Sequence, residues 1–136
     1  MADLVITAAN VLPSGGGIDA EGIAAVTITA GQSVYQDPNS GQIQLAKGDT
    51  AVHAAAVGVA LHAALAGQPI RYRQSGGLAL GAILTAGALY VVSAANPGGI
   101  APNADMTAGN FVSVLGYASS TSVLQLAPIV TGTAHG

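Results

Sequence analysis

The chain contains no cysteine and no tryptophan, and it carries very little charge. Without cysteine, disulfides, zinc–thiolate sites, iron–sulfur clusters and thiol nucleophiles are excluded, and the redox compartment cannot be inferred. Only three basic residues, Lys47, Arg71 and Arg73, stand against six acidic ones. Binding to nucleic acid through its phosphates needs a basic patch. We therefore expect no nucleic-acid partner.

Long apolar runs and targeting signals are also missing. The most apolar stretch, residues 78–92, is shorter than the roughly 20 residues that a membrane-spanning helix needs, and Gly81 and Gly87 interrupt it. The first residues, Met1-Ala2-Asp3, lack the basic region of a signal peptide. We expect a soluble protein that is not secreted through a classical signal and has no membrane partner.

Apolar residues dominate what remains. They make up 51% of the 136 residues, and charged residues make up 7%, against about 25% in an ordinary globular protein. The mean hydropathy is +0.56. The charged residues are too few for the surface of a freely soluble monomer. Burial in a symmetric oligomer or on a larger assembly would remove apolar area from water, at about 25 cal/mol per Å². The composition favours a structural or assembly protein.

Turn-forming residues recur at nearly even spacing and predict an all-β fold. Short runs of alternating or β-branched residues lie between the turns. These expected strands are residues 24–30, 42–45, 70–74, 89–92, 111–115 and 123–126. Several short strands at roughly ten-residue spacing are typical of a small β-sandwich or barrel.

Two segments need separate treatment. Residues 50–66 are rich in alanine, which favours helix by propensity. Gly58, with β-branched Val57 and Val59 on either side, favours instead a short helical turn over residues 51–56 and a strand from Val57. The N-terminal residues 1–17 end in a glycine-rich hinge. We interpret them as an extended arm before a single β-rich domain, residues 18–136.

The residues that could support catalysis are few and scattered. His53 and His62 lie nine residues apart with no carboxylate at metal-ligand spacing, so both are expected to be ordinary surface or half-buried histidines. Asp19 and Glu21 would share one face of a strand, but their glycine-rich surroundings favour a solvated loop. No G-x-S-x-G nucleophile motif is present. We therefore expect neither an enzyme nor a cofactor or metal.

The sequence Arg71-Tyr72-Arg73 is the only basic cluster. On a strand, the two arginines would share one face and Tyr72 would lie on the other. Arginine binds carboxylates in a bidentate manner, so the pair could contact a partner protein. Alternatively, the two charges could protect a solvent-facing strand edge from aggregation. The residues alone leave both interpretations open.

Several segments between residues 24 and 133 resemble the head decoration, or cement, proteins of tailed bacteriophages. The residues that carry the resemblance are structural, with no catalytic signature. They are Ile28-Thr29-Ala30-Gly31-Gln32, Val34-Tyr35, Gly58-Val59-Ala60-Leu61-His62-Ala63-Ala64, Gly67-Gln68-Pro69-Ile70, Gly81-Ala82-Ile83-Leu84-Thr85-Ala86-Gly87, Tyr90-Val91-Val92-Ser93, Pro97-Gly98-Gly99-Ile100-Ala101-Pro102, Asp105, Gly109, Leu115-Gly116-Tyr117-Ala118, Pro128-Ile129 and Thr131-Gly132.

The resemblance implies a β-rich, β-tulip-like protein that forms homotrimers on the outer surface of an icosahedral capsid. Such a protein is made in the host cytoplasm, binds the phage major capsid protein and holds neighbouring capsid subunits together against internal DNA pressure. Contacts with the capsid or an adjacent protomer are expected first from Leu4, Val5 and Ile6, and less strongly from Arg71 and Arg73. Deleting residues 2–12 is expected to leave the trimer folded and abolish capsid binding.

Two other classes of function stay open. A head-fibre or spike module that recognises a host surface glycan would need an aromatic-lined groove, and the dispersed tyrosines argue against it. A small hydrolase would need a nucleophile paired with a base, and the sequence offers no such pair.

Overall fold

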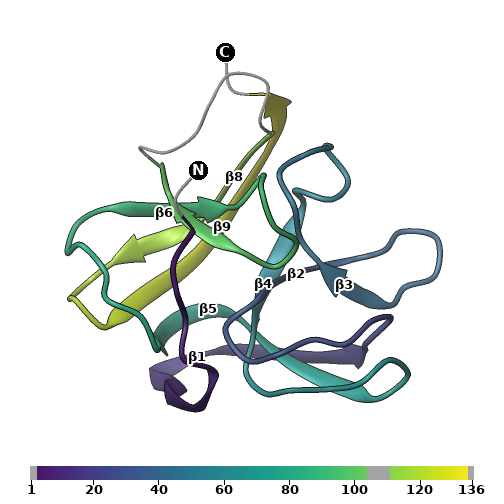
Figure 1. Ribbon diagram of the computed structural model, residues 1–136, viewed down its shortest axis with the longest axis horizontal. Helices are drawn as coiled ribbons and strands as arrows, with labels where there is room; N and C mark the ends of the chain where they lie inside the picture. The colour runs from purple at the N-terminus through teal and green to yellow at the C-terminus, as the bar shows by residue number, and fades with distance from the viewer. Residues whose placement is uncertain (1–2, 104–110, 135–136) are drawn as a thin grey trace.

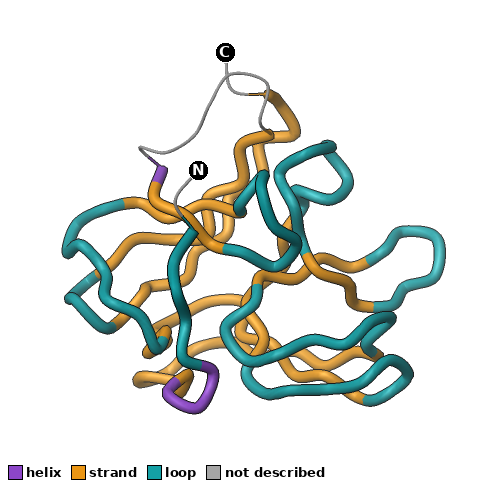
Figure 2. The backbone as a smooth tube through the Cα atoms, in the orientation of Figure 1, coloured by secondary structure: helices purple, strands orange, loops and turns teal. Residues whose placement is uncertain are grey.

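The structure is a computed structural model that describes residues 3–103 and 111–134. Over these ranges the chain forms nine β-strands and one short 3₁₀ helix (Figures 1 and 2). The elements are η1 (Ala8–Asn10), β1 (Val11–Ile23), β2 (Ser33–Gln36), β3 (Ile43–Leu45), β4 (Ala56–Ala60), β5 (Pro69–Leu80), β6 (Leu89–Val92), β7 (Ile100–Pro102), β8 (Phe111–Ala118) and β9 (Val123–Ala134).

The nine strands form one antiparallel sheet. The strand order is β3-β2-β4-β5-β9-β8-β6-β7, and β1 pairs with β5 outside this path. The sheet curls into a half-barrel, as Figure 1 shows. The prediction of an all-β fold is confirmed.

Strand β5 connects the two halves of the sheet. Its first half pairs with β4 and its second half with β9, while β1 follows β5 over nearly its whole length. The pairing of β1 with β5 skips two residues between Ser14 and Gly17, which is a β-bulge. Opposite the bulge, Gly76 has a φ of 98°, and a Cβ there would collide with the Gly16 backbone. Glycine is the residue that fits this position, because L side chains rarely adopt such a φ.

The core has two parts, and β2, β4 and β5 each contribute side chains to both. The larger contains side chains from β5, β6, β8 and β9, among them the fully buried Leu80. Tyr90 is 2% exposed, and its hydroxyl accepts a hydrogen bond from the Thr85 amide at 2.8 Å. The smaller part joins β2, β3, β4 and β5 around Ile28 and Ile70. The short strands β2, β4 and β6 each bury consecutive residues, so both faces of these strands are covered by the rest of the protein.

Residues 3–10 form an N-terminal strap across the front of the sheet, descending from β6 to η1 in Figure 1. The Leu4 amide donates to the Ile100 carbonyl of β7, and the Thr7 amide donates to the Gly81 carbonyl after β5, both at 2.8 Å. The Asp3 carboxylate accepts hydrogen bonds from Ser93 at 2.7 Å and Asn96 at 2.8 Å. The strap therefore connects β7, at one end of the strand order, to the centre of the sheet.

This arrangement corrects the expected boundary after residue 17. The glycines at positions 15–17 lie inside β1, which runs unbroken from Val11 to Ile23. They form a bulge paired against β5 instead of a hinge, because the backbone of β5 supplies the partners that an isolated glycine-rich segment lacks. The first 17 residues are therefore a strap and half of a strand.

One local expectation also needs correction. Residues 24–30 form no strand; Ala24 and Ile28 make only isolated bridges, to Ile43 and Ala64. The short helical turn expected at 51–56 is a hydrogen-bonded turn over residues 51–54, where the Ala54 amide donates to the Thr50 carbonyl at 3.0 Å, and β4 begins at Ala56. The strand expected from Val57 is therefore confirmed to within one residue.

Candidate functional site

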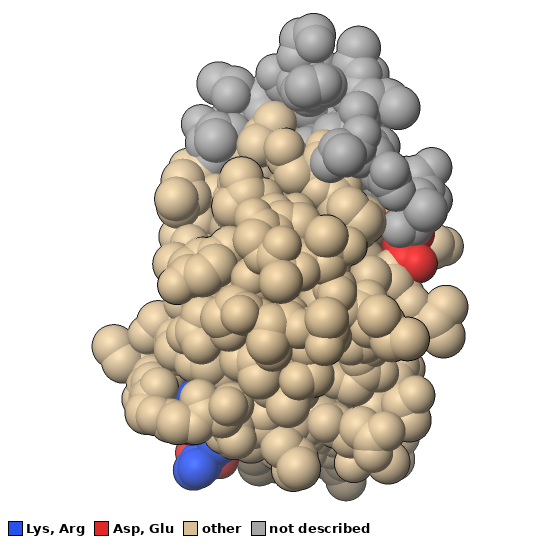
Figure 3. Space-filling model, turned by 90° about the vertical axis from the view of Figure 1, so that its left-hand side faces the viewer, with Lys and Arg blue, Asp and Glu red and all other residues tan. Residues whose placement is uncertain are grey.

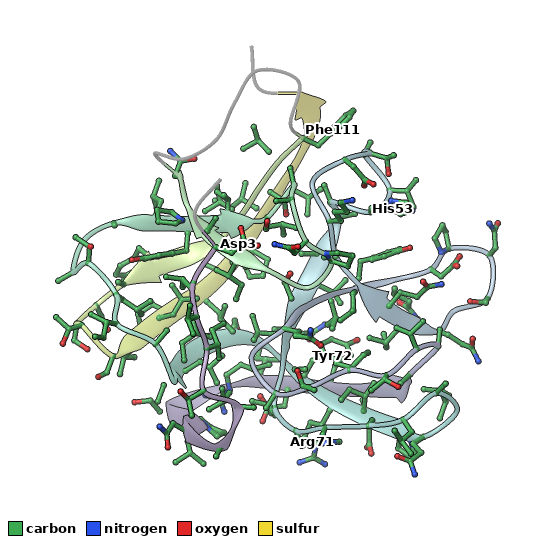
Figure 4. All side chains as sticks on the ribbon, viewed as in Figure 1. Asp3, His53, Arg71, Tyr72 and Phe111 are labelled. Atoms are coloured by element: carbon green, nitrogen blue, oxygen red, sulfur yellow. The ribbon has the colours of Figure 1, made fainter. Side chains whose placement is uncertain are left out.

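The structure separates the two arginines that the sequence grouped together. Both face β1, where Arg71 is opposite Glu21 and Arg73 is opposite Asp19. The Arg71 side chain is 56% exposed, and its Nη2 lies 4.0 Å from Glu21 Oε2. Figure 4 shows Arg71 projecting from the lower edge of the molecule and Tyr72 lying inward of it. Arg71 therefore remains available to a partner.

Arg73 is buried, which corrects the expectation that it meets solvent or a partner. Its side chain is 6% exposed, and its Nε donates to Asp19 Oδ1 at 2.8 Å. Its Nη1 donates to the carbonyls of Gly77 at 2.8 Å and Gly15 at 3.3 Å. The β1 bulge lies over the guanidinium and supplies the Gly15 carbonyl, while the Gly77 carbonyl comes from β5 itself. Asp19 thus belongs to a paired strand, where the sequence suggested a solvated loop.

The three strap residues predicted as contacts differ in orientation. Leu4 and Ile6 pack against the larger part of the core, while Val5, between them, is 89% exposed. The strap alternates as a strand does, with one face inward and one outward. Of the three, Val5 is the residue free to contact another molecule.

Val5 lines a shallow hollow together with Ile83, which is also 89% exposed, and we call it the apolar hollow after these two side chains, although Thr7, Asn10 and Ser122 also line it. The hydrogen bond from Thr7 to Gly81 holds the strap against the turn after β5 and forms this hollow. Its volume is about 470 Å³, and its lining contains no charged residue: Val5, Thr7, Asn10, Ala79, Gly81, Ala82, Ile83 and Ser122. Isolated exposed apolar residues are ordinary, but two almost fully exposed aliphatic side chains in one hollow indicate a contact surface.

The second half of the chain provides almost no charge to surround this hollow. From Gln74 to the C-terminus, Asp105 is the only Asp, Glu, Lys or Arg, and it lies outside the described residues. Figure 3 shows the side of the molecule that is on the left in Figure 1, where blue and red appear only near the margins. An uncharged surface of this kind suits contact with another protein better than exposure to water.

A second, polar pocket lies on the other half of the sheet. Its volume is about 460 Å³, and its lining is Val26, Thr27, Tyr35, Gln44, Leu45, Lys47, Asp49, His53 and Pro97. His53 Nδ1 lies 2.8 Å from Asp49 Oδ1, and the rings of His53 and Tyr35 are 5.6 Å apart. The sequence alone did not predict this group. Its one indication there is the spacing of Asp49 and His53, which are four residues apart and so could interact across a turn.

The polar pocket alters the ionisation of Asp49. Burial alone would raise the pKa of this carboxyl, but the hydrogen bond and charge of His53, with the field of Lys47, hold the pKa below its ordinary value of 3.8. A depressed pKa means that the ionised carboxyl stabilises the fold above pH 3.8 and that this contribution disappears as the pH falls through the lower folded-state pKa.

We therefore expect Asp49→Asn to be less stable than the wild type near neutral pH and equal to it in strong acid. The difference is expected to be small, because Asp49 is 39% exposed. Thermal unfolding of both proteins across the acid range measures it. A difference that stays constant with pH would show that the carboxyl charge contributes nothing.

The remaining His, Asp and Glu side chains form no metal centre over the described residues. His62 Nε2 accepts from the Arg71 amide at 3.0 Å, and its Nδ1 lies 2.9 Å from the Ala63 carbonyl. Across residues 3–103 and 111–134, the His, Asp and Glu side chains do not gather in any group of three that could hold a metal ion. No helix in the same ranges is long and apolar enough to cross a membrane.

The apolar hollow and the polar pocket, together with the exposed Arg71, are thus features of the described surface that could contact another molecule. Searches of the chain against known protein families, curated proteins and solved structures found no match.

Proposed function

We propose that this chain is a structural decoration protein that binds the outer surface of an icosahedral phage head. It would act as a homotrimer that bridges neighbouring major capsid subunits and stabilises the head against internal DNA pressure. The observation that carries the proposal is the apolar hollow, in which Val5 and Ile83 are each 89% exposed and no lining residue is charged.

Physical chemistry supports an assembly role of this kind. Burying an aliphatic side chain the size of valine or isoleucine contributes about 1.5–3 kcal/mol. A trimer would present the hollow three times, so that weak individual contacts act together and raise the overall affinity by 10²–10⁴-fold. The sequence resemblance to phage cement proteins supplies the identity of the partner.

Charge introduced into the hollow tests the proposal. Val5→Asp and Ile83→Asp are each expected to weaken binding to capsid shells of the same virus by at least tenfold, because they remove apolar burial and place an unpaired carboxylate in the contact. Co-sedimentation of purified protein with undecorated shells measures this. Val52→Asp is the matched control, since Val52 is 50% exposed and lies outside the hollow.

Equal occupancy of the shells by all three variants would overturn the role of the hollow. Failure of the wild-type protein to bind shells at all would overturn the proposed function. The native mass of the free protein tests the trimer separately, with about three times 13.1 kDa expected across a dilution series.

A further inference from the structure

The polar pocket is lined by a tyrosine whose hydroxyl group the fold does not use. Tyr35, on β2, lines the pocket and is 5% exposed. Its hydroxyl makes no hydrogen bond with any residue in the described part of the chain, yet it is not among the fully enclosed polar atoms there. The ring is thus packed in the protein while the hydroxyl remains open to the pocket. A buried tyrosine ordinarily finds a hydrogen-bond partner.

The ionisation of Tyr35 keeps this hydroxyl a donor. Burial raises the pKa of the phenol, and the negative charges of Asp37 and Asp49 raise it further. The hydroxyl therefore stays protonated at every pH at which the protein is expected to work. It can donate one hydrogen bond to a molecule in the pocket and accept another.

The neighbouring polar groups supply both acceptors and donors. Because the ionised Asp49 can only accept, His53 Nδ1 must carry the hydrogen between them, which leaves Nε2 of a neutral His53 as an acceptor. Figure 4 places His53 on the loop before β4. Lys47 Nζ, a donor, lies 3.9 Å from Asp49 Oδ2. Lys47 and the ionised Asp49 carry opposite charges, so the lining presents no single sign of charge that would favour an anionic or a cationic ligand.

The rest of the lining is uncharged and includes Thr27 and Gln44 beside three apolar residues. Val26, Leu45 and Pro97 form an uncharged wall beside these groups. A pyranose sugar presents an apolar C–H face and a rim of hydroxyls that both donate and accept hydrogen bonds. The volume of about 460 Å³ is within the usual range for small-molecule sites, roughly 300–1,000 Å³.

We propose that the polar pocket binds a neutral saccharide, with the Tyr35 hydroxyl donating to a sugar hydroxyl, Asp49 and His53 accepting from others, and the apolar wall contacting the ring. This inference goes beyond the capsid-binding role and does not depend on it. The pocket and the apolar hollow share no lining residue.

A panel of neutral hexoses, N-acetylhexosamines and their short oligosaccharides tests the proposal, first on an array and then by calorimetric titration of the retained probe. Tyr35→Phe is expected to weaken binding of that probe about tenfold. Its melting temperature is expected to match the wild type, because the hydroxyl has no partner inside the described fold. Tyr117→Phe is the matched control, since Tyr117 is 48% exposed on β8 and lies outside the pocket.

Three results would overturn the proposal: no neutral saccharide is retained by the wild type, Tyr35→Phe binds it equally well, or sulfated and sialylated probes bind more tightly than neutral ones. Co-sedimentation of Tyr35→Phe with capsid shells separates the two proposals, because this variant is expected to bind shells as the wild type does. If Tyr35→Phe loses sugar binding but still binds shells, the saccharide site is supported. If the wild type binds shells but retains no sugar, the saccharide proposal is rejected and the capsid-binding proposal stands.

Discussion

Replacing Arg73 with leucine is expected to lower the free energy of unfolding by about 3 kcal/mol, near the lower end of the range for breaking a buried ion pair. The substitution leaves Asp19, which is 28% exposed, without its cation. It also removes the donor at 2.8 Å from the Gly77 carbonyl. The lower end of the range applies because water partly reaches the Asp19 carboxylate.

Arg71→Leu is the matched control, two residues away on the same strand. Its partner Glu21 is 4.0 Å distant and both side chains are more than half exposed, so a change below about 1 kcal/mol is expected. Denaturant unfolding measures both variants. Adding Asp19→Asn to Arg73→Leu is expected to restore part of the loss, because the uncompensated charge is then gone. Equal losses for Arg71→Leu and Arg73→Leu would contradict the ion-pair explanation.

Deleting residues 2–7 is expected to destabilise the fold by about 3 kcal/mol or more. The deletion removes the apolar contacts of Leu4 and Ile6, worth about 1–2 kcal/mol each when partly buried. It also removes the hydrogen bonds of Asp3, Leu4 and Thr7 to three separate parts of the sheet, each with a net contribution of about 1 kcal/mol. The strap is therefore part of the fold, and the earlier expectation that its removal affects only capsid binding needs this correction.

Point substitutions separate the two faces of the strap. Ile6→Ala is expected to cost about 2 kcal/mol, because the Ile6 side chain packs on the core and against Gly31. Val5→Ala is expected to leave stability within about 0.5 kcal/mol, because Val5 is 89% exposed. Thermal or denaturant unfolding of both variants gives the comparison. Similar losses would mean that the strap is not oriented as described.

Local sequence patterns predicted those strands whose residues strongly favour the β conformation. β3, β6 and the first parts of β8 and β9 follow from β-branched or alternating residues. β1 was missed because Pro13 and the three glycines after Ser14 depress strand propensity. Its pairing with β5 connects residues more than 45 positions apart, and that tertiary pairing outweighs local preference. Residues 24–30 show the converse: the alternation there reflects burial of Ile28, although the segment forms only isolated bridges.

The candidate sites were less predictable than the strands. The strap sequence marked Val5 as a contact, but it could not show that Leu4 and Ile6 turn inward. The burial of Arg73 depends on the bulge of β1 closing over it, and nothing near position 73 encodes that bulge. The polar pocket brings together Tyr35 from β2 and His53 from the loop before β4. It also includes Pro97 from the second half of the chain. Only the folded sheet brings these residues together.

The strap also sets the order in which the chain can complete its fold. Asp3 bonds to Ser93 and Asn96, and Leu4 bonds to Ile100, so these strap residues find their partners among residues made more than 85 positions later. Contacts this distant in sequence close late and slow folding. A nascent chain that ends just before residue 93 has Gly81 as a partner for Thr7 but no partner for Asp3 or Leu4. Final closure of the strap is therefore a step that follows synthesis of β7.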